Sequence, residues 1–147
     1  GWNYRFTNIQ AAMGLAQLER LEKTVKIKRQ IGSWYNDYLK DIPEFTLPLC
    51  STSYAKNIYW VFGVVLNDRH DRQEITSKLK LKGIGTRPFF YPLHKQPALH
   101  NYIEKGQINL FPISERIAKQ GFYLPSSLGL TKDNVKRVTE TLLKILI

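Results

Sequence analysis

Three polar residues stand directly before the first predicted helix. Asn3, Tyr4 and Arg5 supply an amide, a phenol and a guanidinium, and Thr7 with Gln10 forms a T-x-x-Q capping box that predicts a helix start. A helix N-terminus carries partial positive charge and N–H groups without helical partners, so it favours anions. The guanidinium adds a planar fork that suits phosphate or carboxylate. Composition alone still favours an ordinary capped helix whose arginine makes a surface ion pair.

Longer runs of the sequence resemble a known enzyme family. The opening run G-W-N-Y-R-F-T-N-I-Q-A-A-M-G-L-A-Q-L is similar to the G-Y-N-Y-R-M-T-N-I-Q-A-A-I-G-x-A-Q-L signature of the DegT/DnrJ/EryC1/StrS sugar aminotransferases. Further family motifs follow in order at 59–62, 83–94 and 124–131. The run T-R-P-F-F-Y-P-L-H leans toward the perosamine-synthetase-like branch, which aminates a nucleotide-linked 4-keto-6-deoxy sugar.

The resemblance implies an enzyme that depends on pyridoxal phosphate and has the aspartate aminotransferase fold type. In this family the lysine that binds the cofactor lies in a large domain before the Asn-Tyr-Arg loop, and no lysine here matches it. Asn3 matches the asparagine that reaches into the neighbouring subunit and bonds the cofactor phosphate, which implies a homodimer. Tyr4 and Arg5 are assigned to the same interface as substrate-binding residues. Trp2 replaces the usual tyrosine and loses its hydroxyl.

A second group of site residues follows from the same resemblance. Arg87, Tyr91 and His94 match the R-P-x-x-Y-P-L-H segment, which lines the substrate side of the family's site. The resemblance implies that Arg87 holds a sugar or diphosphate oxygen and that Tyr91 and His94 bond sugar hydroxyls. From the residues alone, Arg87 in an ion pair and His94 bonded to backbone are alternatives that stay open.

Metal and disulfide chemistry find little support in the sequence. Cys50 is the only cysteine, so an internal disulfide or a cysteine metal cluster is not expected. The histidines at 70, 94 and 100 lack helical metal-ligand spacing, so we predict no metal site. A single cysteine fits a reducing compartment, and we expect a cytoplasmic protein.

Composition limits the class of protein. The chain has 147 residues, 43% of them hydrophobic and 23% charged, which is typical of one globular domain. No apolar run approaches the roughly 20 residues that span a bilayer, so no membrane partner is expected. The net charge of +10 permits a nucleic-acid binder, but the basic residues are dispersed along helices without a recognised binding motif. We therefore expect solvated helix faces, or a positive field that attracts a nucleotide sugar.

Hydrophobic periodicity predicts a mixture of helices and short strands. Helices are expected at 8–42, with a bend at Gly32 and a stop at Pro43, and at 72–82, 98–104, 113–120 and 131–146. Strands are expected at 58–66, 84–90 and 122–125, the last at a sheet edge. Gly83, Ser114 and Thr131 are the expected helix-end residues. The predicted fold is α+β: a small sheet covered by helices, with a long N-terminal helix.

Together these observations predict a single domain. Residues 1–147 are expected to be the single C-terminal small domain of a sugar aminotransferase, whose large lysine-bearing domain is absent and whose reaction serves cell-surface polysaccharide biosynthesis. The intact enzyme would use a nucleotide sugar and an amino-acid donor, most simply glutamate. This chain supplies no catalytic residue and is expected to be inactive alone. The alternative is a non-catalytic module that dimerises or binds an intact aminotransferase.

Overall fold

A short antiparallel sheet lies at the centre of the fold, with strand order β1-β2-β4-β3. The computed structural model describes residues 1–102 and 111–146. Its elements are α1 (Asn8–Leu18), α2 (Leu21–Leu39), β1 (Phe45–Thr46), β2 (Phe62–Leu66), α3 (Arg72–Leu81), β3 (Arg87–Pro88), η1 (Leu93–Lys95), η2 (Pro97–Tyr102), α4 (Pro112–Gln120), β4 (Gly121–Leu124) and α5 (Lys132–Leu146). The predicted α+β class, a small sheet covered by helices, is confirmed.

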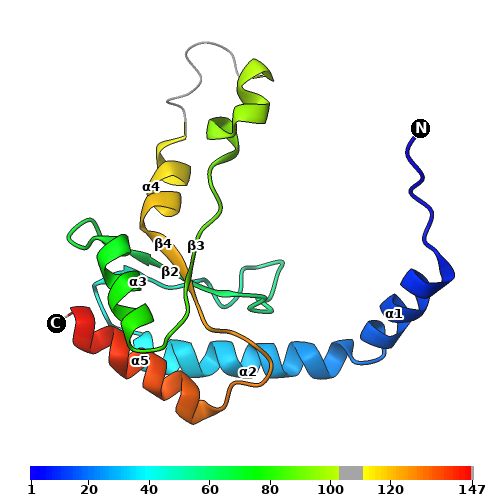
Figure 1. The fold of residues 1–147 in the computed structure, drawn as a ribbon. Helices are drawn as coiled ribbons and strands as arrows, with labels where there is room; N and C mark the ends of the chain where they lie inside the picture. Colours follow the sequence, from blue (N-terminus) through cyan, green and yellow to red (C-terminus); the bar gives the residue numbers. More distant parts are fainter. Residues whose placement is uncertain (103–110, 147) are drawn as a thin grey trace.

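The core lies between one face of the sheet and helices α2, α3 and α5. Alternate residues of β2 point into it, because successive side chains of a strand face opposite sides. The tyrosine ring of Tyr35 on α2 stacks on Phe62 with ring centroids 4.6 Å apart. Figure 1 shows α2 and α5 running beneath the sheet. The fully buried side chains are Ile31, Tyr35, Leu39, Phe62, Val64, Leu66, Leu79, Phe122, Val135, Thr139 and Leu142.

The opposite face of the sheet is covered by an aromatic ring. Phe89 follows β3 and lies against the backbone of β2 and β4, where both strands carry a glycine. A Cβ built on Gly63 would lie 2.6 Å from Cζ of Phe89, and a Cβ on Gly121 would lie 2.4 Å from its Cδ2. The ring also stacks on Tyr123, with centroids 4.6 Å apart. The two glycines therefore make room for a ring that packs directly on this face.

The predicted long N-terminal helix is wrong in one respect. It consists of two helices that separate at Glu19 and Arg20, and the expected bend residue Gly32 lies inside α2. Gly32 instead leaves space for the ring of Tyr59, because a Cβ at this position would lie 2.4 Å from the ring. The break lies in a stretch that has left the core, since α1 has no buried residue and the four buried residues of α2 begin at Ile31. The chain leaves α2 at Leu39, before Pro43.

Two predicted strands are shorter than expected. The strand predicted at 58–66 begins at Phe62, because Tyr59 has φ of 51° and this left-handed conformation cannot continue a strand. The strand predicted at 84–90 covers only Arg87–Pro88. The strand predicted at the sheet edge is β4, which is internal because β2 and β3 pair with it on either side. Its register places Arg87 opposite Tyr123.

Most helix predictions are confirmed within a few residues. Gly83, with φ of 72°, ends α3, and the Thr131 hydroxyl accepts a hydrogen bond from the backbone N–H of Asn134 at the start of α5. Ser114 does not cap α4, which begins at Pro112. The helix predicted at 98–104 is the 3₁₀ helix η2 up to Tyr102, and 103–104 lie outside the described residues. None of the helices within 1–102 and 111–146 combines the length and apolarity needed to cross a bilayer.

Candidate functional site

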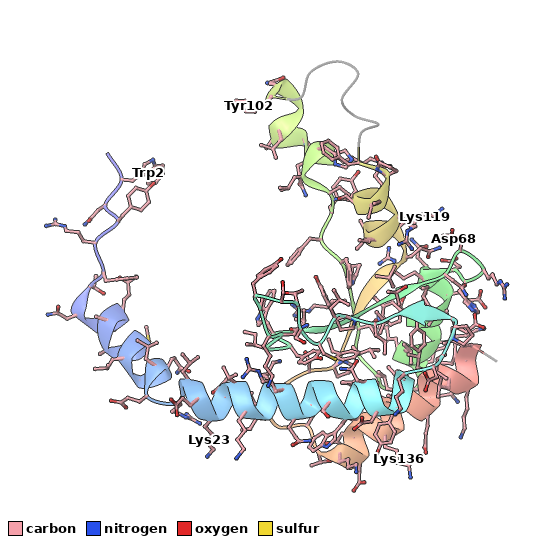
Figure 2. The ribbon with its side chains drawn as sticks, turned by 180° about the vertical axis from the view of Figure 1, so that it is seen from behind. Trp2, Lys23, Asp68, Tyr102, Lys119 and Lys136 are labelled. Atoms are coloured by element: carbon pink, nitrogen blue, oxygen red, sulfur yellow. The ribbon has the colours of Figure 1, made fainter. Side chains whose placement is uncertain are left out.

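Asn3, Tyr4 and Arg5 lie on an arm that stands apart from the body of the fold (Figure 1). Figure 2 shows Trp2 near the end of this arm, and Trp2, Tyr4 and Phe6 are each more than four-fifths exposed. The predicted capping box is present: Gln10 N–H donates to the Thr7 hydroxyl at 3.3 Å, and Thr7 N–H donates to the Gln10 side-chain oxygen at 2.9 Å. The arm therefore leads into a capped helix start, and the residues before it face solvent.

The side chains of Asn3 and Arg5 contact each other on the arm. The Asn3 Oδ1 atom accepts hydrogen bonds from the Arg5 backbone N–H at 3.2 Å and from Arg5 Nε at 3.4 Å. Within the described part of the chain, these bonds use the amide oxygen and leave the Asn3 amide N–H donors and the terminal guanidinium nitrogens unengaged. Such donors, held together by a local turn, can bind an oxyanion that another molecule presents.

Arg87, Tyr91 and His94 lie on a segment that leads away from the sheet. Arg87 is exposed on β3, and Tyr91 is 60% exposed in the loop that follows. They border different depressions: Arg87 lines one of about 480 Å³ and Tyr91 lines one of about 630 Å³. Neither contains Asn3, Tyr4 or Arg5 among its lining residues. Within one chain, the two predicted groups of site residues do not form a common site.

His94 is 8% exposed and is held by two neighbours. Its Nε2 atom lies 3.0 Å from Oε1 of Glu115 on α4, and its ring lies 4.9 Å from that of Phe111. The other carboxylate oxygen of Glu115 accepts a hydrogen bond from Lys95 Nζ at 2.7 Å. The hydrogen bonds from Lys95 and then His94 lower the pKa of Glu115. The partner of His94 is thus a carboxylate, and no other hydrogen bond of its ring is present among residues 1–102 and 111–146.

The loop after β4 is fastened to α2 by two side chains. Tyr35 donates its hydroxyl to the Pro125 carbonyl at 2.7 Å, and Lys28 Nζ donates to the Ser126 carbonyl at 2.5 Å. Burial lowers the pKa of Lys28 and raises that of Tyr35. Sequence reasoning placed neither donor near the site, because residues 90 and 98 positions apart in the chain meet only after folding. The loop they hold forms one wall of the depression beside Arg87.

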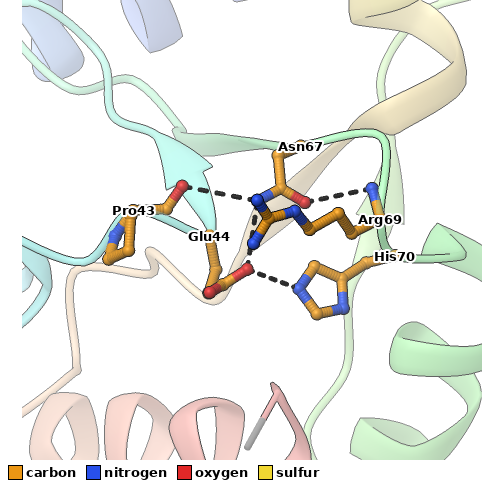
Figure 3. Close-up of polar contacts among 5 residues, drawn as sticks. All are labelled: Pro43, Glu44, Asn67, Arg69 and His70. Atoms are coloured by element: carbon orange, nitrogen blue, oxygen red, sulfur yellow. Dashed lines mark hydrogen bonds and ion pairs between the residues drawn. The ribbon is translucent and has the colours of Figure 1, made fainter.

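A separate polar cluster joins the turn before α3 to the start of β1. Figure 3 shows Glu44 Oε2 between His70 Nε2 at 2.7 Å and Asn67 Nδ2 at 3.0 Å. Asn67 also accepts a hydrogen bond from the backbone N–H of Arg69 at 3.2 Å. The hydrogen bond from His70, followed by that from Asn67, lowers the pKa of Glu44. This cluster fixes the turn, and no His, Cys, Asp or Glu group within 1–102 and 111–146 could hold a metal ion.

Comparison with known proteins supplies the family. The family model described as DegT/DnrJ/EryC1/StrS aminotransferase matches residues 1–143. The GDP-perosamine synthases of Vibrio cholerae and Escherichia coli O157:H7 are each 35% identical, over 93% and 97% of this chain and 36% and 37% of their own lengths. The crystal structure of the aminotransferase TlmJ from Streptoalloteichus hindustanus is 25% identical, with a TM-score of 0.80 over 94% of this chain and 36% of its own. The chain thus spans just over a third of the relatives it matches.

Proposed function

The chain belongs to the DegT/DnrJ/EryC1/StrS aminotransferase family, and we propose that it is the C-terminal domain of a sugar aminotransferase dependent on pyridoxal phosphate. The intact enzyme transfers an amino group from an amino acid, glutamate in the simplest case, to a nucleotide-linked 4-keto-6-deoxy sugar. Its product serves cell-surface polysaccharide biosynthesis, and the enzyme itself lies in the cytoplasm. The observation that carries the proposal is the match over 1–143, which includes both groups of predicted site residues.

The donors on the N-terminal arm fit a phosphate group. Asn3 and Arg5 lie together ahead of a capped helix and offer an amide and a guanidinium to neighbouring anionic groups. Because the arm extends away from its own sheet, it suits a site on a second chain better than one on its own (Figure 1). We therefore assign the cofactor phosphate to Asn3 and the neighbouring substrate oxygens to Tyr4 and Arg5, across a homodimer interface.

The second group forms the substrate side of the site. Exposed Arg87 and Tyr91 bind the sugar nucleotide or the amino donor directly, and His94 contributes its Nδ1 atom while Glu115 holds Nε2. The ion pair of Lys95 with Glu115 keeps the loop in place. When bound, pyridoxal phosphate supplies the electron sink that amino-group transfer needs. The residues of this chain orient the ligands and restrict their motion, so the chain alone is expected to be inactive.

Subunit mixing tests the assignment of Asn3. In the active dimer, Asn3→Ala is expected to weaken retention of the cofactor at least tenfold, whereas Asn101→Ala, a matched change on the exposed η2, leaves it unaltered. Mixing the Asn3→Ala protein with a variant that lacks the cofactor-binding lysine should restore about one quarter of the activity, because half of the randomly assorted dimers are mixed and each has one intact site. No recovery would place Asn3 in the site of its own chain.

The function itself is tested by an amino-transfer assay. The protein carrying this chain together with its lysine-bearing part is incubated with L-glutamate, pyridoxal phosphate and GDP- or dTDP-linked 4-keto-6-deoxyhexose. We expect 2-oxoglutarate and an amino sugar, detected by mass spectrometry. A protein that produces neither favours the second candidate, a non-catalytic module. The exposed apolar arm supports that candidate too, and it predicts co-elution of this chain with an intact aminotransferase on size exclusion.

A further inference from the structure

The depression beside Arg87 brings one arginine together with the hydroxyl groups of one threonine and two serines, besides the phenol of Tyr123. Arg87 is the first residue of β3 and Thr86 directly precedes it, and Ser126 and Ser127 come from the loop after β4. The antiparallel pairing of Arg87 with Tyr123 makes these two segments neighbours. Within 1–102 and 111–146, no hydrogen bond or ion pair joins the guanidinium or the three hydroxyls to another side chain. These groups therefore remain available to a ligand.

The wall that carries the serines has a fixed position. The carbonyl groups of Pro125 and Ser126 both accept hydrogen bonds from side chains of α2, and the Tyr35 donor is fully buried. The Leu130 N–H donates to the Ser127 carbonyl at 3.2 Å and closes the turn. A loop with its carbonyls held in this way loses little further entropy when its hydroxyls bind a ligand.

The charge and size of the depression select the kind of ligand. Among the described residues that line it, Arg87 is the only charged one, and apolar groups of Val61, Leu124 and Pro125 make up much of the rest. A diphosphate carries at least two charges and usually meets several cations, whereas a carboxylate carries one and matches a single guanidinium fork. The volume of about 480 Å³ suits a small organic molecule.

We propose that this depression is a carboxylate-binding site, in which Arg87 pairs with the carboxylate while the hydroxyls of Thr86, Ser126 and Ser127 donate to its oxygens. In the enzyme proposed above, on which this assignment rests, the ligand is the amino-acid donor. Lys28 and Tyr35 are positioning residues, because they hold the wall without touching the ligand. Arg87 thereby recognises the donor and leaves the sugar nucleotide to other residues.

The test is a titration of the 147-residue chain with L-glutamate, followed by NMR at constant ionic strength. We expect saturable shifts at Thr86, Arg87, Ser126 and Ser127, with a Kd on the order of millimolar, as for one charge-assisted pair with few other contacts. Arg87→Gln should weaken binding at least tenfold, and Arg87→Lys should weaken it less, since it keeps the charge but loses the fork. The spectrum of each variant also reports whether the fold is intact.

Arg116→Gln on α4 is the matched control, because it removes the same charge from an exposed arginine outside the depression. It should leave the Kd unchanged. An absence of saturable shifts, equal weakening by Arg116→Gln, or tighter binding of inorganic phosphate than of L-glutamate at the same residues would each overturn the assignment. In an active enzyme, Arg87→Gln should raise the KM for glutamate and spare that for the sugar nucleotide. An inactive enzyme would refute the proposed function and leave the titration to decide the carboxylate site.

Discussion

Replacing Gly63 by alanine should destabilise the fold through one aromatic ring. The added Cβ would lie 2.6 Å from Cζ and 2.8 Å from Cε1 of Phe89, about 1 Å closer than an ordinary carbon contact. Overpacking of this kind costs about 1–3 kcal/mol. Alanine regains about 0.5–1 kcal/mol because it restricts the unfolded chain more than glycine does. We therefore expect Gly63→Ala to lower the free energy of unfolding by about 0–2.5 kcal/mol, with a central value of about 1 kcal/mol.

The atoms involved predict a specific rescue. Leucine at position 89 has no atoms at the places of Cζ and Cε1, so Gly63→Ala should be neutral or slightly stabilising in a Phe89→Leu background. Gly121→Ala is the matched control, because its Cβ would also lie 2.5 Å from the Ile117 carbonyl oxygen. Backbone cannot move aside as a ring can. Phe89→Leu should therefore leave Gly121→Ala destabilised by about 3 kcal/mol or more.

Urea unfolding of the two double-mutant cycles measures these effects. The cycle with Gly63 should give a coupling energy of about 1–3 kcal/mol. In the cycle with Gly121, the coupling energy should be a smaller fraction of the destabilisation that Gly121→Ala causes on its own. Equal destabilisation by Gly63→Ala with and without Phe89 would refute the placement of the ring on β2. A fully rescued Gly121→Ala would refute the contact with the Ile117 carbonyl.

Three further predictions concern polar contacts. Because the hydrogen bond from His70 lowers the pKa of Glu44 from its ordinary 4.5, the stability it adds is present above that pH and is lost as the pH falls through the lowered value. The difference in urea midpoint between wild type and Glu44→Gln should shrink over this range, and a constant difference would contradict the pairing. Thr131→Ala removes the cap of α5 and should cost about 1 kcal/mol in unfolding free energy by the same assay; no loss would argue against the cap. Tyr35→Phe leaves the Pro125 carbonyl without its donor and should also cost about 1 kcal/mol, whereas an unchanged midpoint would show that this hydrogen bond adds no net stability.

Local patterns predicted the helices better than the strands. The ends of α3 and α5 lie within one residue of the prediction, since apolar spacing and the end residues Gly83 and Thr131 act locally. The length of β2 depends on Tyr59, whose left-handed backbone is supported by the space over Gly32, 27 positions away. The break between α1 and α2 falls at residues with ordinary helix propensity. Every residue from Gly1 to Lys23 is exposed, and sequence periodicity does not report where packing against the core begins.

The candidate site was predictable only where a contiguous motif carries it. The capping box at Thr7 and the run that contains Arg87 and His94 are visible in the sequence. Glu115 is 21 positions from His94, and Ser126 is 98 positions from Lys28, so these contacts arise from the tertiary fold. The depression beside Arg87 likewise depends on the pairing of β3 with β4, which no local pattern encodes.

Because of helix α1, the helix content of this chain should depend on the protein concentration as well as on the sequence. Helix α1 has 11 residues and buries none of them on its own chain, and isolated helices of this length are marginal in water even with a good cap. Whatever covers α1 therefore contributes most of its stability, and association and helix formation obey one mass-action equilibrium. If a second copy of the chain packs on α1, the far-ultraviolet circular dichroism per residue is expected to grow with protein concentration. Dilution alone would then unwind α1 while the sheet stays folded.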